Sequence, residues 1–119
     1  MQAFESLDST NNYLKKLAAE GAAEGTVVIA DEQTAGRGRM GRSFASAAGC
    51  GIYMSMLLRP ADCAPDCAQS LTAVCAVAVC RAVEKVCGRA PGIKWINDLY
   101  LRGKKICGIL CESSVKNGR

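Results

Sequence analysis

The sequence predicts an α+β protein with a mainly antiparallel sheet flanked by helices. Strand-like and helical segments follow one another in the order β-α-β, a basic loop, and then β-α-β-β. The late segments are joined by tight turns, which favours hairpins and antiparallel pairing. Half of the 119 residues are hydrophobic and 22% are charged, which is typical of a single globular domain.

The first half of the chain predicts a helix followed by a strand. The side chains of Asp8, Ser9 and Thr10 can cap a helix that runs to Glu20 with an apolar stripe. Glycines at 21 and 25 end that helix. Residues 26–31 are then expected to form a strand that is buried on both faces.

The second half predicts strands around one long helix. Residues 50–58 alternate as a strand, and residues 66–87 form a helix that is apolar nearly all round and should pack against a sheet. Segments at 93–96 and 99–101 follow, and a turn at Arg102-Gly103 leads into a last strand over 104–112. One face of the strand at 50–58 is expected to carry Ile52, Met54, Met56 and Leu58.

A basic loop from Gln33 to Phe44 joins two of these strands. Arg37, Arg39 and Arg42 alternate there with glycines, and no acid interrupts them. Fixing such a backbone costs roughly 1–2 kcal/mol per residue, and the loop has little to bury. We therefore expect an anion to order it, and residues 36–46 to be poorly ordered without one.

Three interpretations compete for this loop. Gly36, Gly38 and Gly41 match the dinucleotide fingerprint as text, but no capped helix opens on the third glycine. RNA-binding Arg-Gly segments usually come as repeats in disordered flanks, and the net charge of +4 is modest for a nucleic-acid binder. A phosphate-clamping loop fits better, because the arginine fork bonds two phosphate oxygens while glycines let the backbone fold over the ligand.

Eight cysteines and no histidine occur in the chain. There is no Cys-x-x-Cys pair; Cys63/Cys67 and Cys107/Cys111 are each spaced by four. We expect buried free thiols rather than a disulfide framework or a metal site. Reduced thiols and the lack of a secretory signal predict a cytoplasmic protein. The lack of an apolar run of about 18 residues predicts that the chain does not enter membranes.

Two lysine segments complete the candidate chemistry. Lys94, Asn97 and Asp98 place a cation, a carboxamide and a carboxylate at a strand end, although an Asn-Asp turn beside a solvated lysine explains this segment better when it is taken alone. Lys105 shares a strand face with apolar residues, so its ammonium could point into a pocket or reach for solvent.

Four segments in this order resemble the successive motifs of the biotin protein ligases, the biotin–[acetyl-CoA-carboxylase] ligases. They span residues 8–110, and each is weakly specific alone. The motifs are Asp8-Ser9-Thr10-Asn11, Gln33-x-x-Gly36-Arg37-Gly38-Arg39-x-Gly41-Arg42, Lys94-Trp95-x-Asn97-Asp98-Leu99 and Lys105-x-x-Gly108-Ile109-Leu110.

This resemblance implies the incomplete catalytic fold of biotin and lipoate ligases, which is class II synthetase-like. It implies that biotin, ATP and Mg²⁺ give biotinyl-5′-AMP, and that the biotinyl group passes to a lysine of a biotin carboxyl carrier domain of acetyl-CoA carboxylase. Residues 1–119 would be the N-terminal part of the catalytic domain, without DNA-binding or C-terminal domains. No DNA partner is then expected, and a homodimer stays open.

The resemblance also assigns roles to residues. Catalysis would fall to Arg37, Arg39, Asp98 and Lys105, with Asp98 the candidate to touch Mg²⁺. Nucleotide binding would fall to Arg39, Lys94, Asn97 and Asp98. Biotin binding would fall to Ser9, Thr10, Asn11, Gln33, Arg37, Gly38, Arg39 and Lys105.

Two positions depart from the family pattern. Phe44 stands where the family usually has tryptophan, and Ile96 stands where it usually has proline. A lipoate–protein ligase shares the fold and the adenylate logic, although the Gly-Arg-Gly-Arg loop favours biotin. A nucleic-acid-binding module that uses the same arginines is the alternative from another class.

Overall fold

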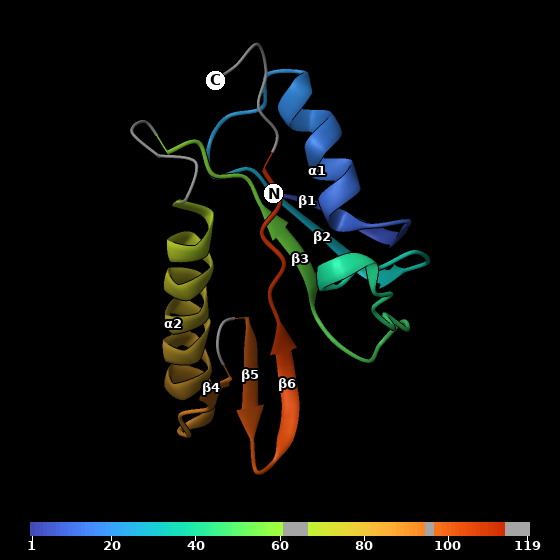
Figure 1. Ribbon diagram of the computed structural model, residues 1–119. Helices are drawn as coiled ribbons and strands as arrows, with labels where there is room; N and C mark the ends of the chain where they lie inside the picture. The colour runs from blue at the N-terminus through green and yellow to red at the C-terminus, as the bar shows by residue number, and fades with distance from the viewer. Residues whose placement is uncertain (61–66, 95–96, 114–119) are drawn as a thin grey trace. The chain divides into compact units, whose positions relative to one another are not determined.

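A computed structural model describes residues 1–60, 67–94 and 97–113. The chain divides into two compact units, Met1–Ala61 and Asp62–Arg119, each of which is described by itself. Figure 1 shows the elements of both units. Among the described helices, neither offers an apolar run that would reach across a lipid bilayer.

The first unit is a three-stranded sheet with one helix. It contains β1 (Gln2–Leu7), α1 (Thr10–Ala19), β2 (Val27–Gln33) and β3 (Tyr53–Met56). The central strand β2 pairs parallel with β1 and antiparallel with β3. α1 connects β1 to β2 and lies against β2 and β3 (Figure 1).

Packing in this unit centres on one face of β2. Val28 and Ala30 are buried there together with Leu14 of α1. The rings of Phe4 on β1 and Tyr13 on α1 lie 4.8 Å apart and close one side of this core. Buried apolar residues at alternate positions are what fixes the register of a strand.

Both ends of α1 are capped by side chains. Ser9 Oγ accepts a hydrogen bond from the backbone N–H of Asn12, which makes Ser9 the N-cap. At the other end, the Arg59 guanidinium donates to the carbonyl oxygens of Ala18 and Ala22 at 3.0 and 2.8 Å. A cation at the negative end of the helix dipole is favourable, so Arg59 holds the segment that follows β3 against the end of α1.

The second unit is a helix beside a small antiparallel sheet. It contains α2 (Cys67–Cys87), β4 (Gly92–Lys94), β5 (Asp98–Leu101) and β6 (Lys104–Gly108), with the strands in the order β4-β5-β6. α2 contacts β4 and β5, and Leu99 and Ala76 are fully buried. The hairpin between β5 and β6 turns at Arg102 and Gly103, whose φ angles of 54° and 75° suit a type I′ turn.

Most predicted elements are confirmed, with α1, β2, α2 and the hairpin close to their expected ranges. Several details were wrong. β4, β5 and β6 lie at the three segments expected after α2, although the expected order counted only two strands there. β3 is shorter than residues 50–58, and β6 ends at Gly108 rather than at residue 112. β2 buries only one face fully, since Val27 and Ile29 are half-buried and Asp31 is exposed. The first strand of the expected order corresponds to β1, although the sequence pattern had given no residue range for this strand.

Candidate active site

The start of α1 is tied to the end of β2 by the side chain of Gln33. Its Oε1 accepts from the backbone N–H of Thr10 at 2.8 Å and from the Thr10 hydroxyl at 3.0 Å. Its Nε2 donates to Ser46 Oγ at 2.9 Å. All three bonds join segments that are distant in the sequence, so Gln33 fixes the helix start relative to both ends of the basic loop.

A second polar contact joins α1 to β3. The Oγ atoms of Thr10 and Ser55 lie 2.7 Å apart, and Ser55 also donates to Asn11 Oδ1. Ser9 and Thr10 are only 2% and 4% exposed, so their side chains present almost no surface. Asn11 is half-buried and is therefore the more accessible of the three predicted residues here.

The basic loop is a folded hairpin. Gln33 pairs with Ser46 and Arg37 with Ser43 as isolated bridges, and Phe44 N donates to the Gly36 carbonyl at 2.8 Å. Gly38 N donates to Arg42 O at 2.7 Å. The sequence predicted that this segment has little to bury; the structure gives it backbone pairing of its own, which does not require the residues to be apolar.

Gly36 is the tightest point of this hairpin. A Cβ atom placed there would come within 2.6 Å of both Phe44 O and Ser46 Oγ, and within 2.9 Å of Gln33 Nε2. The backbone can pass only because glycine has no side chain. Gly38, by contrast, has open surroundings, with Arg42 atoms no closer than 3.7 Å to such a Cβ.

Arg37 and Arg39 differ in how they are held. Arg37 is half-buried, and its Nη2 donates to Asn12 Oδ1 on the first turn of α1. Arg39 is exposed and begins a short 3₁₀ turn, Arg39–Gly41, in which Met40 has a φ of 59°. Thus one arginine is fixed to the helix, while the other projects from the tip of the hairpin.

Asp8 adds a carboxylate to the same corner. Its Oδ1 accepts from Ser9 N at 2.7 Å, and its Oδ2 accepts from Asn12 Nδ2 at 3.3 Å. The bond from the Ser9 N–H, the bond from the Asn12 amide and the charge of Arg37 lower the pKa of Asp8 below its ordinary value. Asp8 is therefore an anion at neutral pH.

In the second unit, Lys105 pairs with Asp98. The Lys105 ammonium lies 3.1 Å from Asp98 Oδ1, and their side chains are 41% and 21% exposed. Asp98 stands opposite Lys94 in the β4–β5 register, and the Lys94 ammonium lies 5.6 Å above the ring of Tyr100. One cation thus pairs with the Asp98 carboxylate, and a second, Lys94, lies on the neighbouring strand opposite it.

Asn97 joins the start of β5 to the segment that follows β6. Its side-chain Nδ2 donates to the backbone oxygen of Ile109 at 3.2 Å, and its backbone carbonyl accepts from the N–H of Ile109 at 2.9 Å. The other two members of this motif, Trp95 and Ile96, lie outside the described residues. Burial and the charge of Asp98 raise the pKa of the Cys107 thiol, although Lys105 opposes this effect.

Free thiols, as expected, are found at Cys50, Cys75, Cys80, Cys87, Cys107 and Cys111. The expectation that they are buried was wrong for Cys50, Cys87 and Cys111, which are exposed within their units. Within the described ranges, no three Cys, Asp or Glu side chains gather as metal ligands. Asp98 alone supplies a carboxylate near the predicted nucleotide residues, which fits Mg²⁺ because this ion commonly takes one or two carboxylates together with substrate phosphates.

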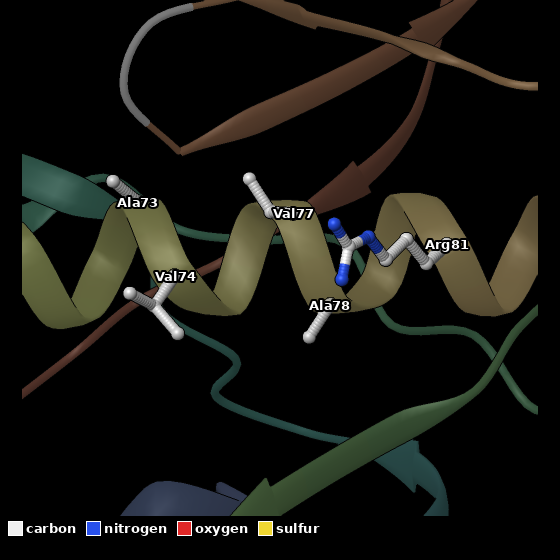
Figure 2. A pocket seen from close by; sticks show the side chains of 5 residues that line it. All are labelled: Ala73, Val74, Val77, Ala78 and Arg81. Carbon is white, nitrogen blue, oxygen red and sulfur yellow. The ribbon is translucent and has the colours of Figure 1, made fainter.

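Two hollows occur in the second unit, away from the predicted residues. Figure 2 shows the first, of about 330 Å³, against α2. Its lining is apolar except for Arg81, with Ala73, Val74, Val77 and Ala78 around it. The second, of about 560 Å³, lies between Arg89 and the β5–β6 hairpin. Neither is lined by a predicted site residue.

Three residues that hold predicted site residues in place were not predicted from the sequence, namely Asn12, Ser46 and Ser55. Ser55 carried a usable signal, because it shares its strand face with Tyr53 and Leu57, and a polar residue on an otherwise apolar face must find a partner once it is buried. No comparable signal marked Asn12, whose partner lies 25 residues further along the chain.

Comparisons with known proteins agree with this layout. The sequence profile described as the Biotin/lipoate A/B protein ligase family matches residues 3–118, so the chain belongs to that family. The chain is 45% identical over 113 residues to the bifunctional ligase/repressor BirA of Bacillus subtilis, covering 95% of this chain and 34% of BirA. It is 41% identical to the biotin–[acetyl-CoA-carboxylase] ligase of Mycobacterium tuberculosis, covering 87% of this chain and 41% of the relative.

Solved structures are similar too. The biotin protein ligase of Leishmania major in complex with biotinyl-5-AMP matches with a TM-score of 0.83 and 30% identity, over 95% of this chain and 51% of that one. The Aquifex aeolicus enzyme with biotin and ATP matches with a TM-score of 0.81 and 36% identity, over 94% and 46%. The chain has the α+β fold of biotin protein ligase catalytic domains and spans about a third to a half of these relatives.

Proposed function

We propose that this chain is the N-terminal part of a biotin protein ligase catalytic domain. It would take part in joining biotin to ATP, which gives biotinyl-5′-AMP and pyrophosphate, and in passing the biotinyl group to a lysine of a biotin carboxyl carrier domain. The family membership supports this, as do relatives named biotin–[acetyl-CoA-carboxylase] ligase and neighbours solved with biotin, ATP and biotinyl-5-AMP. The use of ATP and a carboxylase domain would place the reaction in the cytoplasm.

The observation that carries the proposal is the pair of arginines on a folded hairpin beside the start of α1. In the first step a carboxylate oxygen of biotin bonds to the α-phosphorus of ATP, and the bond from that phosphorus to the bridging oxygen breaks. Two anions must approach each other for this to happen. Positive charge from Arg37, which Asn12 holds, and from Arg39 at the tip of the hairpin lowers that repulsion.

In the second step the neutral amine of the carrier lysine attacks the acyl carbon. An amide bond forms, the acyl–oxygen bond to the phosphate breaks, and AMP leaves with that oxygen. The amine loses its extra proton to solvent or to a nearby base. The arginines on the phosphate stabilise the charge that develops on the leaving AMP.

Biotin recognition is assigned to Asn11, Gln33 and Gly38 together with the buried Ser9 and Thr10. Gln33 Oε1 already accepts twice from Thr10, and Nε2 gives one of its two N–H groups to Ser46, so its second N–H can bond the biotin ring without exchanging a bond. Ser9 and Thr10 would act mainly by holding the helix start, because they expose so little surface.

Nucleotide binding is proposed for Lys94, Asn97 and Asp98 as well as Arg39, and Lys105 is proposed to act on the reacting oxygens. Lys105 would leave Asp98 for the reacting oxygens, and Asp98 would then be available to Mg²⁺. Bound Mg²⁺ would neutralise phosphate charge and favour the release of pyrophosphate.

The decisive experiment is mass spectrometry of a carrier domain incubated with the chain, ATP, Mg²⁺ and biotin, alongside calorimetry with biotinyl-5′-AMP. Biotinyl addition, or adenylate binding without transfer, supports the proposal. Lipoyl addition from lipoate in place of biotinyl addition would overturn it in favour of a lipoate ligase. Arg39→Ala and Lys105→Ala should lower adenylate formation by about 100-fold or more, with Lys16→Ala on the exposed side of α1 as the matched control.

A further inference from the structure

The hydroxyl of Ser46 has a fixed direction, because one of its neighbours can only accept. Ser46 Oγ donates to the backbone carbonyl oxygen of Phe44 at 3.0 Å, and a carbonyl oxygen has no proton to give. The single hydroxyl proton is thus engaged, and Ser46 Oγ accepts from Gln33 Nε2 at 2.9 Å. Ser46 is only 6% exposed, so its own side chain presents almost no surface to a ligand.

The backbone holds Ser46 opposite Gln33. The two residues form an antiparallel bridge, in which the N–H of Gln33 donates to the carbonyl oxygen of Ser46 at 3.0 Å. Gly36 provides the space for their side-chain bond, since a Cβ atom there would lie 2.6 Å from Ser46 Oγ and 2.9 Å from Gln33 Nε2. The serine, the glutamine and the glycine therefore form one packed unit at the base of the basic loop.

The Gln33 amide is consequently held at both of its ends. Oε1 accepts from the backbone N–H of Thr10 at 2.8 Å and from the Thr10 hydroxyl, and Nε2 donates to Ser46. Because the amide is planar, bonds to both atoms fix its plane, and the flipped amide would place Nε2 against the Thr10 N–H, which cannot accept. The second N–H of Nε2 is left with a single direction, on a side chain that is only half-buried.

Building on the proposed function, we propose that Ser46 is a positioning residue that directs this second N–H of Gln33 at a hydrogen-bond acceptor on the biotin ring. Without the Ser46 hydroxyl, Thr10 would hold the amide by Oε1 alone, and the plane of the amide would be free to turn about that bond. Ser46 thus acts through Gln33 rather than by touching the ligand. This point of the site offers a donor and selects an acceptor of the ligand.

The test removes the hydroxyl in Ser46→Ala. Ser43→Ala is the matched control, because Ser43 lies on the same hairpin, is exposed, and is bridged to Arg37 through the backbone. Two readouts are needed. NMR relaxation of the Gln33 side-chain amide in the free chain measures whether the amide is held, and calorimetry with biotin measures recognition of the ring.

We expect a rigid Gln33 amide in the wild type and in Ser43→Ala, and a mobile one in Ser46→Ala. Biotin binding should weaken about five- to tenfold in Ser46→Ala, as for one poorly made hydrogen bond, and stay unchanged in the control. Gln33→Ala should weaken binding at least as much. Adding Ser46→Ala to Gln33→Ala should cause no further loss, because the serine then has no amide to hold.

A second variant, Gln33→Glu, tests the donor while leaving the Ser46 side chain in place. The carboxylate can accept from Thr10 and from a Ser46 hydroxyl that turns away from Phe44, but it has no N–H for the ligand. Calorimetry here uses biotinamide as well as biotin, because biotinamide has no carboxylate for the new charge to repel. Both ligands should bind about tenfold more weakly than to the wild type.

Four results would overturn the inference. These are a mobile Gln33 amide in the wild type, an amide that stays equally rigid in Ser46→Ala, unchanged biotinamide binding by Gln33→Glu, and a further loss of the same size when Ser46→Ala is added to Gln33→Ala. Failure of the wild type to bind biotin at all would instead count against the proposed function. The NMR comparison would in that case still decide whether Ser46 holds Gln33.

Discussion

At the residue scale, the predicted polar side chains of the first unit bond to one another and to neighbours that were not predicted from the sequence. Gln33, Thr10 and Ser46 form one set, and Asp8, Asn12 and Arg37 form another. Such bonds orient groups before a ligand arrives, so less entropy is lost on binding. The same bonds also make the corner sensitive to pH through Asp8.

The pKa of Asp8 is lowered in the folded state, mainly by the N–H of Ser9. The ionised carboxylate therefore stabilises the fold above the ordinary value of 3.8, and this contribution is lost as the pH falls through the lower folded value. Asp8→Asn should melt slightly below wild type near neutral pH, because an exposed charge contributes little. The difference should vanish in strong acid. Thermal melting across pH 2–7 measures it, and a difference that grows toward low pH would contradict the assignment.

At the element scale, the basic loop depends on the close approach of its two arms at Gly36. Gly36→Ala should destabilise the first unit by about 1–3 kcal/mol, because Phe44 O, Ser46 Oγ and Gln33 Nε2 surround the added methyl group. Gly38→Ala is the matched control, since its surroundings are open and its φ of −108° suits alanine. Urea unfolding of both variants measures the difference. Equal stability would show that the arms are not packed in this way.

Ordering of the loop by an anion remains a prediction. The hairpin has backbone bonds such as Gly38 N to Arg42 O, but its tip, including Arg39 and Met40, is exposed. Backbone bonds that are open to solvent are typical of segments with low local stability. Amides of residues 36–46 should therefore exchange with deuterium rapidly in the free chain, and about tenfold more slowly with biotinyl-5′-AMP. Strong protection without ligand would contradict this.

At the scale of the whole molecule, the class of ligand can be identified from how its binding affinity depends on salt concentration. A nucleic-acid binder that uses Arg37, Arg39 and Arg42 would release several counterions and lose affinity steeply as salt rises. Binding of biotin or its adenylate involves few charges and should change only a few-fold between 50 and 200 mM salt. Calorimetry with biotinyl-5′-AMP, and with a single-stranded RNA as the comparison, separates the two. Tighter and strongly salt-dependent RNA binding would favour the alternative.

The local features of this chain could be predicted from its sequence. The Ser9 cap, the turn at Arg102-Gly103 and the residues of the basic loop depend on neighbours within a few positions. The family resemblance also depends on short motifs, and it identified the fold before any contact was known. Helix propensities and caps depend on nearby residues, and this is why these features could be predicted from the sequence.

Only the tertiary structure decided which partners these residues take. Gln33 bonds Thr10 and Ser46, Arg37 bonds Asn12, and Lys105 pairs with Asp98. It also gave the basic loop a paired backbone, which the sequence had not indicated. These contacts follow from strand register and from the placement of α1 on β2, which bring distant residues together and leave no periodic trace in the sequence.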